Sequence, residues 1–144
     1  MGVTRRVYWD TMIFAYWLEG NKQYASRVQE IHDSMQRRGD ILCSSAFVLA
    51  ELLVGPLKKG RPEQATAVEQ FFSTPEIMMM PFPNSAIHLF AELRAFENLK
   101  PVDALHLSLA ANADVDLFLT NDKRLHSVKR PGLPYITTLQ TDLF

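Results

Sequence analysis

Short apolar runs alternate with longer stretches of helical periodicity along this chain. The apolar runs span three to five residues each, a length typical of strands buried in a sheet. The five strands predicted in this way lie at 6–9, 41–43, 76–80, 115–119 and 135–137. The helices predicted between them span 24–38, 46–54, 62–72, 84–97 and 101–113.

Residues that start or stop helices mark several of these boundaries. Gly39 follows the first helical repeat and occupies the position at which a glycine commonly ends a helix. Ser44 and Ser45 supply an N-cap for the next helix, and Gly55-Pro56 is predicted to end it. Two of the later helices open with a proline, which suits the first helical turn.

Strands and helices that alternate at this spacing imply crossover connections between parallel strands. We therefore predict an α/β fold with a mainly parallel central sheet covered by helices. The chain has 144 residues, of which 47% are hydrophobic and 22% charged, a composition typical of an ordered globular protein. We expect one domain over residues 1–144.

Composition narrows the cellular setting. No apolar run approaches the roughly 20 residues that span a bilayer, and Asp10 and Glu19 interrupt any signal-peptide pattern near the N-terminus. A lone cysteine, Cys43, excludes an internal disulfide framework and a cysteine-based zinc site. We expect a cytoplasmic protein without a membrane partner.

Four acidic residues stand where a parallel sheet brings ligands together, beyond the carboxyl ends of its strands. Asp10 follows the first strand, and Asp122 follows the strand at 115–119 after Thr120-Asn121. Asp103 lies in the first turn of the last helix, and Glu51 lies among apolar neighbours in the helix at 46–54. A carboxylate in so apolar a setting is costly to bury unless it is paired or binds a cation.

Each acid also has an ordinary structural interpretation. Asp10 can cap the helix that follows it, and Asp103 can interact with a helix dipole. Asp122 can be a turn residue, and Glu51 can face solvent. These alternatives stay open for each residue taken singly.

The four acids together favour a metal site. Clustered carboxylates raise one another's pKa unless a cation compensates them, and Mg²⁺ or Mn²⁺ prefers oxygen ligands. Such an ion can activate water for displacement at phosphorus. The net charge of −1 argues against a simple nucleic-acid-binding domain, but without these four acids 15 basic residues face 12 acidic ones, a net +3.

The residues around these acids resemble a known family. The pattern is Asp10-Thr11 after a strand, then Ser44-Ser45 with Ala50-Glu51-Leu52, then Val102-Asp103-Ala104 with His106, then Leu119-Thr120-Asn121-Asp122. It resembles the PIN-domain nucleases over nearly the whole chain, and their VapC-type toxins in length and spacing. Thr-Asn-Asp and Ala-Glu-Leu are its more specific pieces.

The resemblance implies a three-layer α/β/α sandwich and a metal-dependent endoribonuclease that cleaves RNA with metal-activated water. It implies a catalytic and metal-binding quartet of Asp10, Glu51, Asp103 and Asp122, with Mg²⁺ or Mn²⁺ as cofactor. Thr11, Ser45, Thr120 and Asn121 are the expected supporting residues. A protein antitoxin and a homodimer are the partners that the resemblance implies.

One departure from the family keeps a second interpretation open. Members often carry Asn two positions after the first Asp, where this chain has Met12. Because all four acids are present, we expect an active enzyme, and the alternative is a catalytically weak PIN-like module that binds RNA or a partner. A phosphatase with an Asp-x-Asp pair does not fit, since Asp10-Thr11-Met12 supplies one carboxylate.

Basic residues and one histidine complete the candidates. Lys58, Lys59, Lys123 and Arg124 are possible contacts for the RNA backbone, with Lys123-Arg124 favoured because it adjoins Asp122. Taken singly, each pair is more simply explained as solvated turn charges. His106 lies three residues after Asp103, so it is either a metal ligand beside that acid or a packed, hydrogen-bonded helix residue.

Overall fold

Five parallel strands form one sheet at the centre of the molecule. A computed structural model of the chain describes residues 4–144. The strands are β1 (Arg6–Trp9), β2 (Ile41–Ser44), β3 (Ile77–Met79), β4 (Leu117–Leu119) and β5 (Tyr135–Thr137). They are ordered β3-β2-β1-β4-β5, and each pairs in parallel with its neighbours. The predicted parallel sheet is confirmed, with strand ends that differ by one or two residues.

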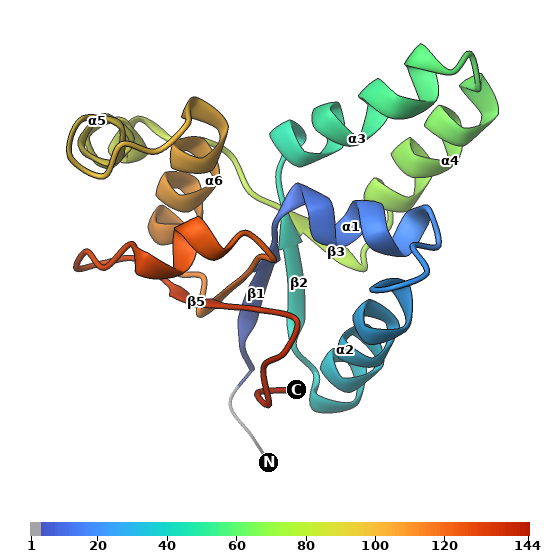
Figure 1. Cartoon of the computed structure of the whole chain (residues 1–144), viewed down its shortest axis with the longest axis horizontal. Coiled ribbons are helices and arrows are strands. Elements are labelled where there is room, and N and C mark those ends of the chain that lie inside the picture. Colours follow the sequence, from blue (N-terminus) through green and yellow to red (C-terminus); the bar gives the residue numbers. More distant parts are fainter. Residues whose placement is uncertain (1–3) are drawn as a thin grey trace.

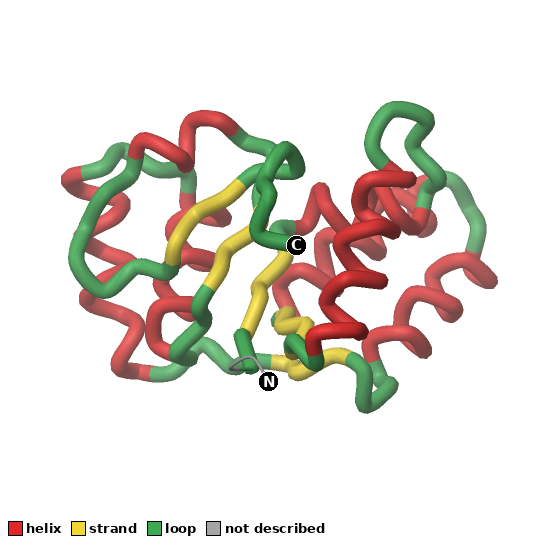
Figure 2. The backbone as a smooth tube through the Cα atoms, turned by 90° about the horizontal axis from the view of Figure 1, so that it is seen from below, coloured by secondary structure: helices red, strands yellow, loops and turns green. Residues whose placement is uncertain are grey.

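Helices cover both faces of this sheet. They are α1 (Thr11–Leu18), α2 (Ala25–Arg38), α3 (Ala46–Lys58), α4 (Pro62–Phe72), α5 (Ile87–Phe96) and α6 (Pro101–Asn112). Two short 3₁₀ helices lie in the connections: η1 (Asn84–Ala86) between β3 and α5, and η2 (Lys123–Ser127) between β4 and β5. α1 to α4 lie on one side of the strands and α5 and α6 on the other (Figure 1), and Figure 2 shows the strands between the two groups of helices. This is the expected three-layer α/β/α arrangement.

The central strand β1 is the most deeply buried part of the sheet. Val7, Tyr8 and Trp9 have no exposed surface. The Trp9 ring lies 5.0 Å from that of Phe14 in α1, and Tyr8 stacks on Phe118 in β4 at 5.4 Å. Large aromatic side chains bury much apolar area, so this packing fixes β1 against α1 and β4. It thereby fixes the position of Asp10, the next residue.

The order in which strands are added to the sheet changes side at β1. β2 and β3 follow on one side of β1, while β4 and β5 lie on the other. The backbone N–H of Asp10 donates to the Leu119 carbonyl at 2.9 Å, which ties the ends of β1 and β4 together. Open α/β sheets bind ligands beyond their carboxyl ends at such a reversal.

Helix α3 is longer than predicted, because Gly55-Pro56 does not end it. The helix runs on through Pro56 to Lys58. Pro56 lacks an N–H, but Lys59 N–H donates to the Gly55 carbonyl at 3.1 Å and Arg61 N–H to the Pro56 carbonyl at 2.9 Å. The turn comes at Gly60, whose φ of +64° suits glycine. α3 then packs against α4 as a helical hairpin.

The helices predicted from sequence do not include α1. Its residues are apolar on nearly every side, so the hydrophobic pattern gives no helical period and no bounds for it. Ile13 and Phe14 are buried, whereas half of the Met12 side-chain surface is exposed. Asp10 caps this helix by accepting a hydrogen bond from the Thr11 N–H at 2.8 Å. Across residues 4–144, no helix combines the length and apolar character needed to cross a membrane.

Candidate active site

All four predicted acids line one cavity at the carboxyl end of the sheet. Its volume is about 270 Å³. Asp10 comes from the end of β1, Glu51 from α3, Asp103 from the first turn of α6, and Asp122 from the start of η2. The other lining residues are Thr11, Met12, Tyr16, Val102 and Asn121. Residues up to 112 positions apart in sequence thus meet in one pocket.

Asp10 is held from two directions. Its Oδ1 accepts from the Thr11 N–H, and its Oδ2 accepts from the Thr120 hydroxyl at 2.8 Å. Burial raises the pKa of Asp10 above its ordinary value, although the Thr120 hydrogen bond, His106 and the Thr11 N–H act against this effect. The structural interpretation of Asp10 as a cap is therefore also correct, and the same contacts aim its carboxylate.

Thr120, one of the predicted supporting residues, contacts two of the acids. It is fully buried, donates its hydroxyl to Asp10 and accepts from the Asp122 backbone N–H at 3.1 Å. Its own N–H donates to the Thr137 carbonyl at 3.0 Å, which anchors it to β5. Asn121 lines the cavity and donates to the Tyr16 hydroxyl at 3.3 Å, without a direct bond to an acid.

Glu51 is anchored through one oxygen. The Thr11 hydroxyl donates to Oε1 at 2.6 Å, and Nε2 of His106 lies 2.8 Å from the same atom. Burial acts to raise the pKa of Glu51, but the two hydrogen bonds outweigh it and hold that pKa below its ordinary value. Glu51 therefore does not simply face solvent, and its carboxylate is kept ionised.

His106 is a packed, hydrogen-bonded residue of α6 rather than a metal ligand beside Asp103, because both of its ring nitrogens have partners within the protein. It is 1% exposed, and its Nδ1 lies 2.7 Å from the Tyr8 hydroxyl. That hydroxyl is also 2.9 Å from the Ser45 hydroxyl. Ser45, which caps α3, thus contacts the acids only through Tyr8 and His106. Sequence reasoning missed Tyr8, because an apolar strand pattern explains a tyrosine equally well.

Asp103 faces its acidic neighbours without a compensating hydrogen bond among the described residues. Burial raises its pKa above the ordinary value, and the negative charges of Asp10 and Asp122 raise it further. Arg124 and His106 act in the opposite direction. The pocket thus disfavours the ionised form of Asp103, which a cation among these acids would stabilise.

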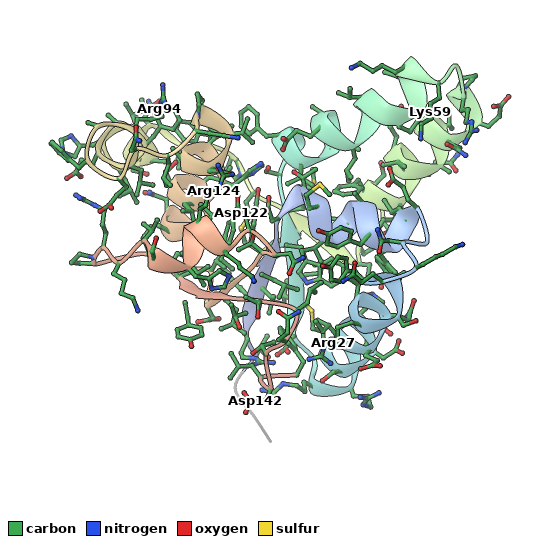
Figure 3. All side chains as sticks on the ribbon, in the orientation of Figure 1. Arg27, Lys59, Arg94, Asp122, Arg124 and Asp142 are labelled. Carbon is green, nitrogen blue, oxygen red and sulfur yellow. The ribbon has the colours of Figure 1, made fainter. Side chains whose placement is uncertain are left out.

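Asp122 is paired with a basic residue on the surface. Nε and Nη2 of Arg124 donate to its two oxygens at 3.1 and 2.7 Å, a bidentate pair (Figure 3). The Arg124 hydrogen bonds hold the pKa of Asp122 below its ordinary value. The Arg124 side chain is 63% exposed, so this pair is open to solvent and weakly held.

As the side chains stand, the acids share a pocket but do not converge on one point. Among residues 4–144, no three carboxylate, imidazole or thiol groups are close enough to hold a metal ion together. Glu51 is turned toward His106 and Thr11, and Asp122 toward Arg124. The donors themselves are all carboxylate oxygens, which suits Mg²⁺ or Mn²⁺. The chemistry of the donor set therefore fits such an ion, although the side chains as they stand do not converge on one.

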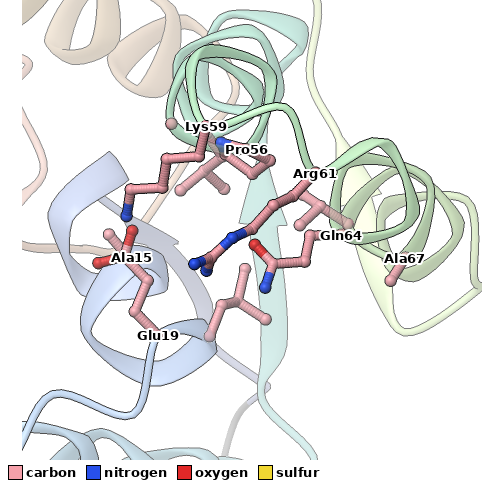
Figure 4. Close-up of a pocket in the computed structure, with 11 residues that line it drawn as sticks. Ala15, Glu19, Pro56, Lys59, Arg61, Gln64 and Ala67 are labelled. Atoms are coloured by element: carbon pink, nitrogen blue, oxygen red, sulfur yellow. The ribbon is translucent and has the colours of Figure 1, made fainter.

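Two of the predicted basic contacts lie away from the acids. Lys58 and Lys59 are at the tip of the α3–α4 hairpin (Figure 3 labels Lys59), whereas Lys123 and Arg124 adjoin Asp122. Lys59 instead lines a larger cavity of about 430 Å³ between α1, α3 and α4 (Figure 4). Glu19 is the only acid in that lining, so this larger cavity is not a carboxylate metal site.

Comparison with known proteins agrees with this fold. The family model described as PIN domain matches residues 7–131. A chain of the VapBC2 complex of Rickettsia felis, bound to promoter DNA, is 21% identical with a TM-score of 0.73, covering 92% of this chain and 98% of that one. A DNA-bound VapBC chain of Salmonella typhimurium is 21% identical with a TM-score of 0.71, covering 94% and 99%.

A third similar structure is VapC20 of Mycobacterium tuberculosis, a toxin that cleaves the sarcin–ricin loop. It is 12% identical with a TM-score of 0.64, and the match covers 88% of this chain and 92% of that one. No curated protein matches the chain in sequence. At these identities the solved structures show the fold alone, whereas the family model spans well over half of the sequence. The chain therefore belongs to the PIN-domain family.

Proposed function

We propose that this protein is a metal-dependent endoribonuclease that hydrolyses RNA phosphodiester bonds, and that it is the toxin of a toxin–antitoxin pair. The observation that carries the proposal is the single cavity lined by Asp10, Glu51, Asp103 and Asp122. The family supports it, because PIN-domain proteins are nucleases. Four acids around one cavity serve no evident packing purpose, since burial and mutual repulsion oppose their ionised forms.

The same acids are the proposed ligands of Mg²⁺ or Mn²⁺. PIN-domain nucleases generally use divalent metal ions. Asp10, Asp103 and Asp122, with Glu51, would hold the ion through oxygen donors. When bound, such an ion lowers the pKa of water and offsets the negative charge that develops at phosphorus. The raised pKa of Asp103 supports this assignment, because a cation would relieve the repulsion from its neighbours.

Residues around the acids would orient them for this reaction. Thr11 donates to both Asp10 and Glu51, and Thr120 connects Asp10 with Asp122. These bonds limit the rotation of the carboxylates before substrate arrives, which reduces the entropy lost on reaching the reactive geometry. The Asp122 carboxylate is the exception, since its partner Arg124 is exposed to solvent.

RNA is the proposed substrate, and Lys123 and Arg124 are the proposed backbone contacts. Both lie in η2, which begins directly after Asp122 at the cavity. Phosphate oxygens accept bidentate hydrogen bonds from arginine, so a substrate phosphate could replace the Asp122 carboxylate as the partner of Arg124. The same movement would free Asp122 for the metal ion. Lys58 and Lys59, at a distance from the acids, would contact only a longer substrate.

A protein antitoxin is the proposed partner. VapBC complexes from Rickettsia felis and Salmonella typhimurium support this, since their chains share the fold over nearly the full length. We further propose a homodimer and a cytoplasmic location. Pull-down with the product of a neighbouring open reading frame, followed by measurement of RNA cleavage, tests the antitoxin proposal.

Met12 favours a second candidate, a PIN-like module that binds RNA or a partner without efficient cleavage. Its apolar side chain, half exposed, lines the cavity where family members often carry Asn. With no three donors converging among residues 4–144, the metal site also needs rearrangement. Both observations are compatible with a weak enzyme.

An RNA cleavage assay decides between the two candidates. Total RNA is incubated with the protein in Mg²⁺ or Mn²⁺, in EDTA, and with the Asp10→Asn variant. Metal-dependent cleavage that disappears in EDTA and in the variant supports the enzyme. RNA binding without cleavage in either metal supports the module, and cleavage that survives both EDTA and the variant rejects the assigned site.

A further inference from the structure

A buried row of polar side chains runs from the start of α3 to Glu51. In order, its members are Ser45, Tyr8, His106 and Glu51, and successive partners are 2.9, 2.7 and 2.8 Å apart. Ser45 and Tyr8 have no exposed surface, and His106 is 1% exposed. Buried polar groups cost free energy unless each donor and acceptor finds a partner, so the direction of every bond in this row is constrained.

The Glu51 end of the row sets the first direction. A carboxylate that also accepts from the Thr11 hydroxyl can only accept, so the proton between Glu51 and His106 belongs to Nε2 of the imidazole. His106 therefore donates to Glu51. This leaves the role of Nδ1 to be decided by the contact with Tyr8.

The Ser45 end of the row sets the remaining directions. The Ser45 hydroxyl oxygen accepts from the Val48 N–H at 3.4 Å and needs an acceptor for its own proton. Tyr8 is the acceptor available among the described residues, so Ser45 donates to Tyr8 and Tyr8 donates to Nδ1 of His106. The reverse order would leave the Ser45 proton without a partner in a fully buried place.

From this accounting we infer that Glu51 places the proton of His106 on Nε2, that Tyr8 and Ser45 hold its Nδ1 as a hydrogen-bond acceptor, and that the imidazole held at both ends positions the Glu51 carboxylate for a metal ion. His106 and Tyr8 are positioning residues, because neither lines the acidic cavity. The inference rests on the proposed metal-dependent function for its purpose, but the tautomer follows from the hydrogen bonds alone.

The two oxygens of Glu51 explain why such positioning matters. Thr11 and His106 both end on Oε1, and Oε2 receives no donor among residues 4–144. One oxygen is thus the anchor and the other is available to a ligand. Outer partners that orient a metal-binding side chain typically change metal affinity or activity by roughly 10- to 100-fold when removed.

Tyr8→Phe is the variant that isolates this effect. It keeps the ring that stacks on Phe118 at 5.4 Å and removes the hydroxyl that donates to His106. The matched control is Tyr24→Phe, the same chemical change in a half-buried tyrosine that does not line the acidic cavity. Circular dichroism at the working temperature selects conditions in which both variants are folded.

The first measurement is the ¹⁵N NMR spectrum of the histidine side chains, recorded without metal and assigned with His106→Gln. We expect Nε2 of His106 to carry the proton and Nδ1 to be unprotonated in the wild type. Tyr8→Phe should shift the Nδ1 resonance of His106, because that nitrogen loses its hydrogen-bond donor, while Nε2 keeps its proton. Tyr24→Phe should leave both resonances unchanged. A wild-type spectrum with the proton on Nδ1 would overturn the inference regardless of any nuclease activity.

The second measurement is Mn²⁺ affinity, with cleavage kinetics as its companion. Tyr8→Phe should weaken Mn²⁺ binding by about tenfold and lower kcat similarly, with KM for RNA unchanged. Mn²⁺ affinity equal to that of the wild type would overturn the positioning role. If the wild type binds Mn²⁺ but cleaves no RNA, the proposed function fails, while the predicted tautomer and the tenfold weakening would still support the positioning role.

Discussion

The two sides of the acidic cavity are built differently. On one side, Asp10 and Glu51 are held by hydrogen bonds from buried or half-buried residues of α1, α6 and the segment just after β4. On the other side, Asp103 has no hydrogen bond among the described residues, and Asp122 pairs with the exposed Arg124. The fold fixes the carboxylates of the first side, whereas the position of the Asp122 carboxylate on the second side depends on the exposed Arg124.

This difference indicates how the pocket can be both stable and adaptable. Hydrogen bonds from Thr11 and Thr120 keep two carboxylates in place. The buried core around Trp9 and Phe14 offsets the free-energy cost of burying them. The exposed pair of Asp122 and Arg124 can open with little loss, because solvent screens ion pairs at the surface and leaves them little net stabilisation. Binding of a metal ion or a phosphate would therefore move mainly the side chains of the second side.

The largest expected effect is on the fixed side. Asp10→Asn should lower RNA cleavage by about 10³-fold or more, since it removes a charged ligand at the centre of the cavity. The fold should persist, because Asn retains an acceptor for the Thr11 N–H and loses a charge that burial disfavours. Single-turnover cleavage and thermal melting measure the two properties. Activity within a few-fold of the wild type would remove Asp10 from the site.

A smaller effect is expected on the open side. Arg124→Ala should tighten Mn²⁺ binding several-fold, because it frees Asp122, and should weaken RNA binding while reducing the salt slope by about one. Isothermal titration and RNA binding at several salt concentrations test this. Lys123→Ala is the control, since it removes an equal charge one position earlier and should weaken RNA binding without tightening Mn²⁺ binding.

The two sides should also differ in how pH affects stability without metal. The raised pKa of Asp103 means that its ionisation destabilises the fold as pH rises above about 4, so Asp103→Asn should raise the free energy of unfolding at pH 7. The lowered pKa of Glu51 means that its ionised form stabilises the fold above about pH 4, and that this contribution is lost as pH falls. Glu51→Gln should therefore lower the free energy of unfolding at pH 7.

Urea denaturation between pH 3 and pH 7 in EDTA checks this contrast. Both side chains are only half-buried, so solvent screening should limit each change to about 1 kcal/mol or less. The two differences from the wild type should shrink toward pH 3. Shifts of the same sign at pH 7 would contradict the opposite surroundings described for these two acids.

The smallest effect is expected at the tip of the α3–α4 hairpin. Lys58→Ala and Lys59→Ala should change the cleavage of a short RNA by less than about twofold, because an exposed charge remote from the cavity acts weakly through screened solvent. A longer RNA should be more sensitive to them. Equal losses for Lys58→Ala and Lys123→Ala on a short substrate would show that the hairpin lies on the RNA path.

Much of the fold was predictable because strands and helices follow local patterns. The sequence predicted five strands, the parallel sheet and the acids that line one cavity, since two of the acids follow strands, directly or after two residues, and the other two lie within helices. Gly55-Pro56 misled the prediction, because packing of α3 against α4 outweighs one missing backbone hydrogen bond.

Contacts between distant side chains could not be predicted in the same way. Tyr8 and His106 are 98 positions apart, and each is explained locally by a strand or by an amphipathic helix. Their hydrogen bond exists because β1 and α6 pack together, which no single segment reveals. The pairing of Arg124 with Asp122 is local, but a basic residue beside an acid indicates equally well a solvated charge or a phosphate contact.

The most direct test of the account is a Mn²⁺ titration followed by electron paramagnetic resonance, comparing the wild type with Asp10→Asn, Glu51→Gln, Asp103→Asn and Asp122→Asn. If the four carboxylates serve one ion site, the wild type binds Mn²⁺ and each substitution weakens that binding. Wild-type binding that all four variants retain unchanged, or no binding by the wild type, would contradict the account.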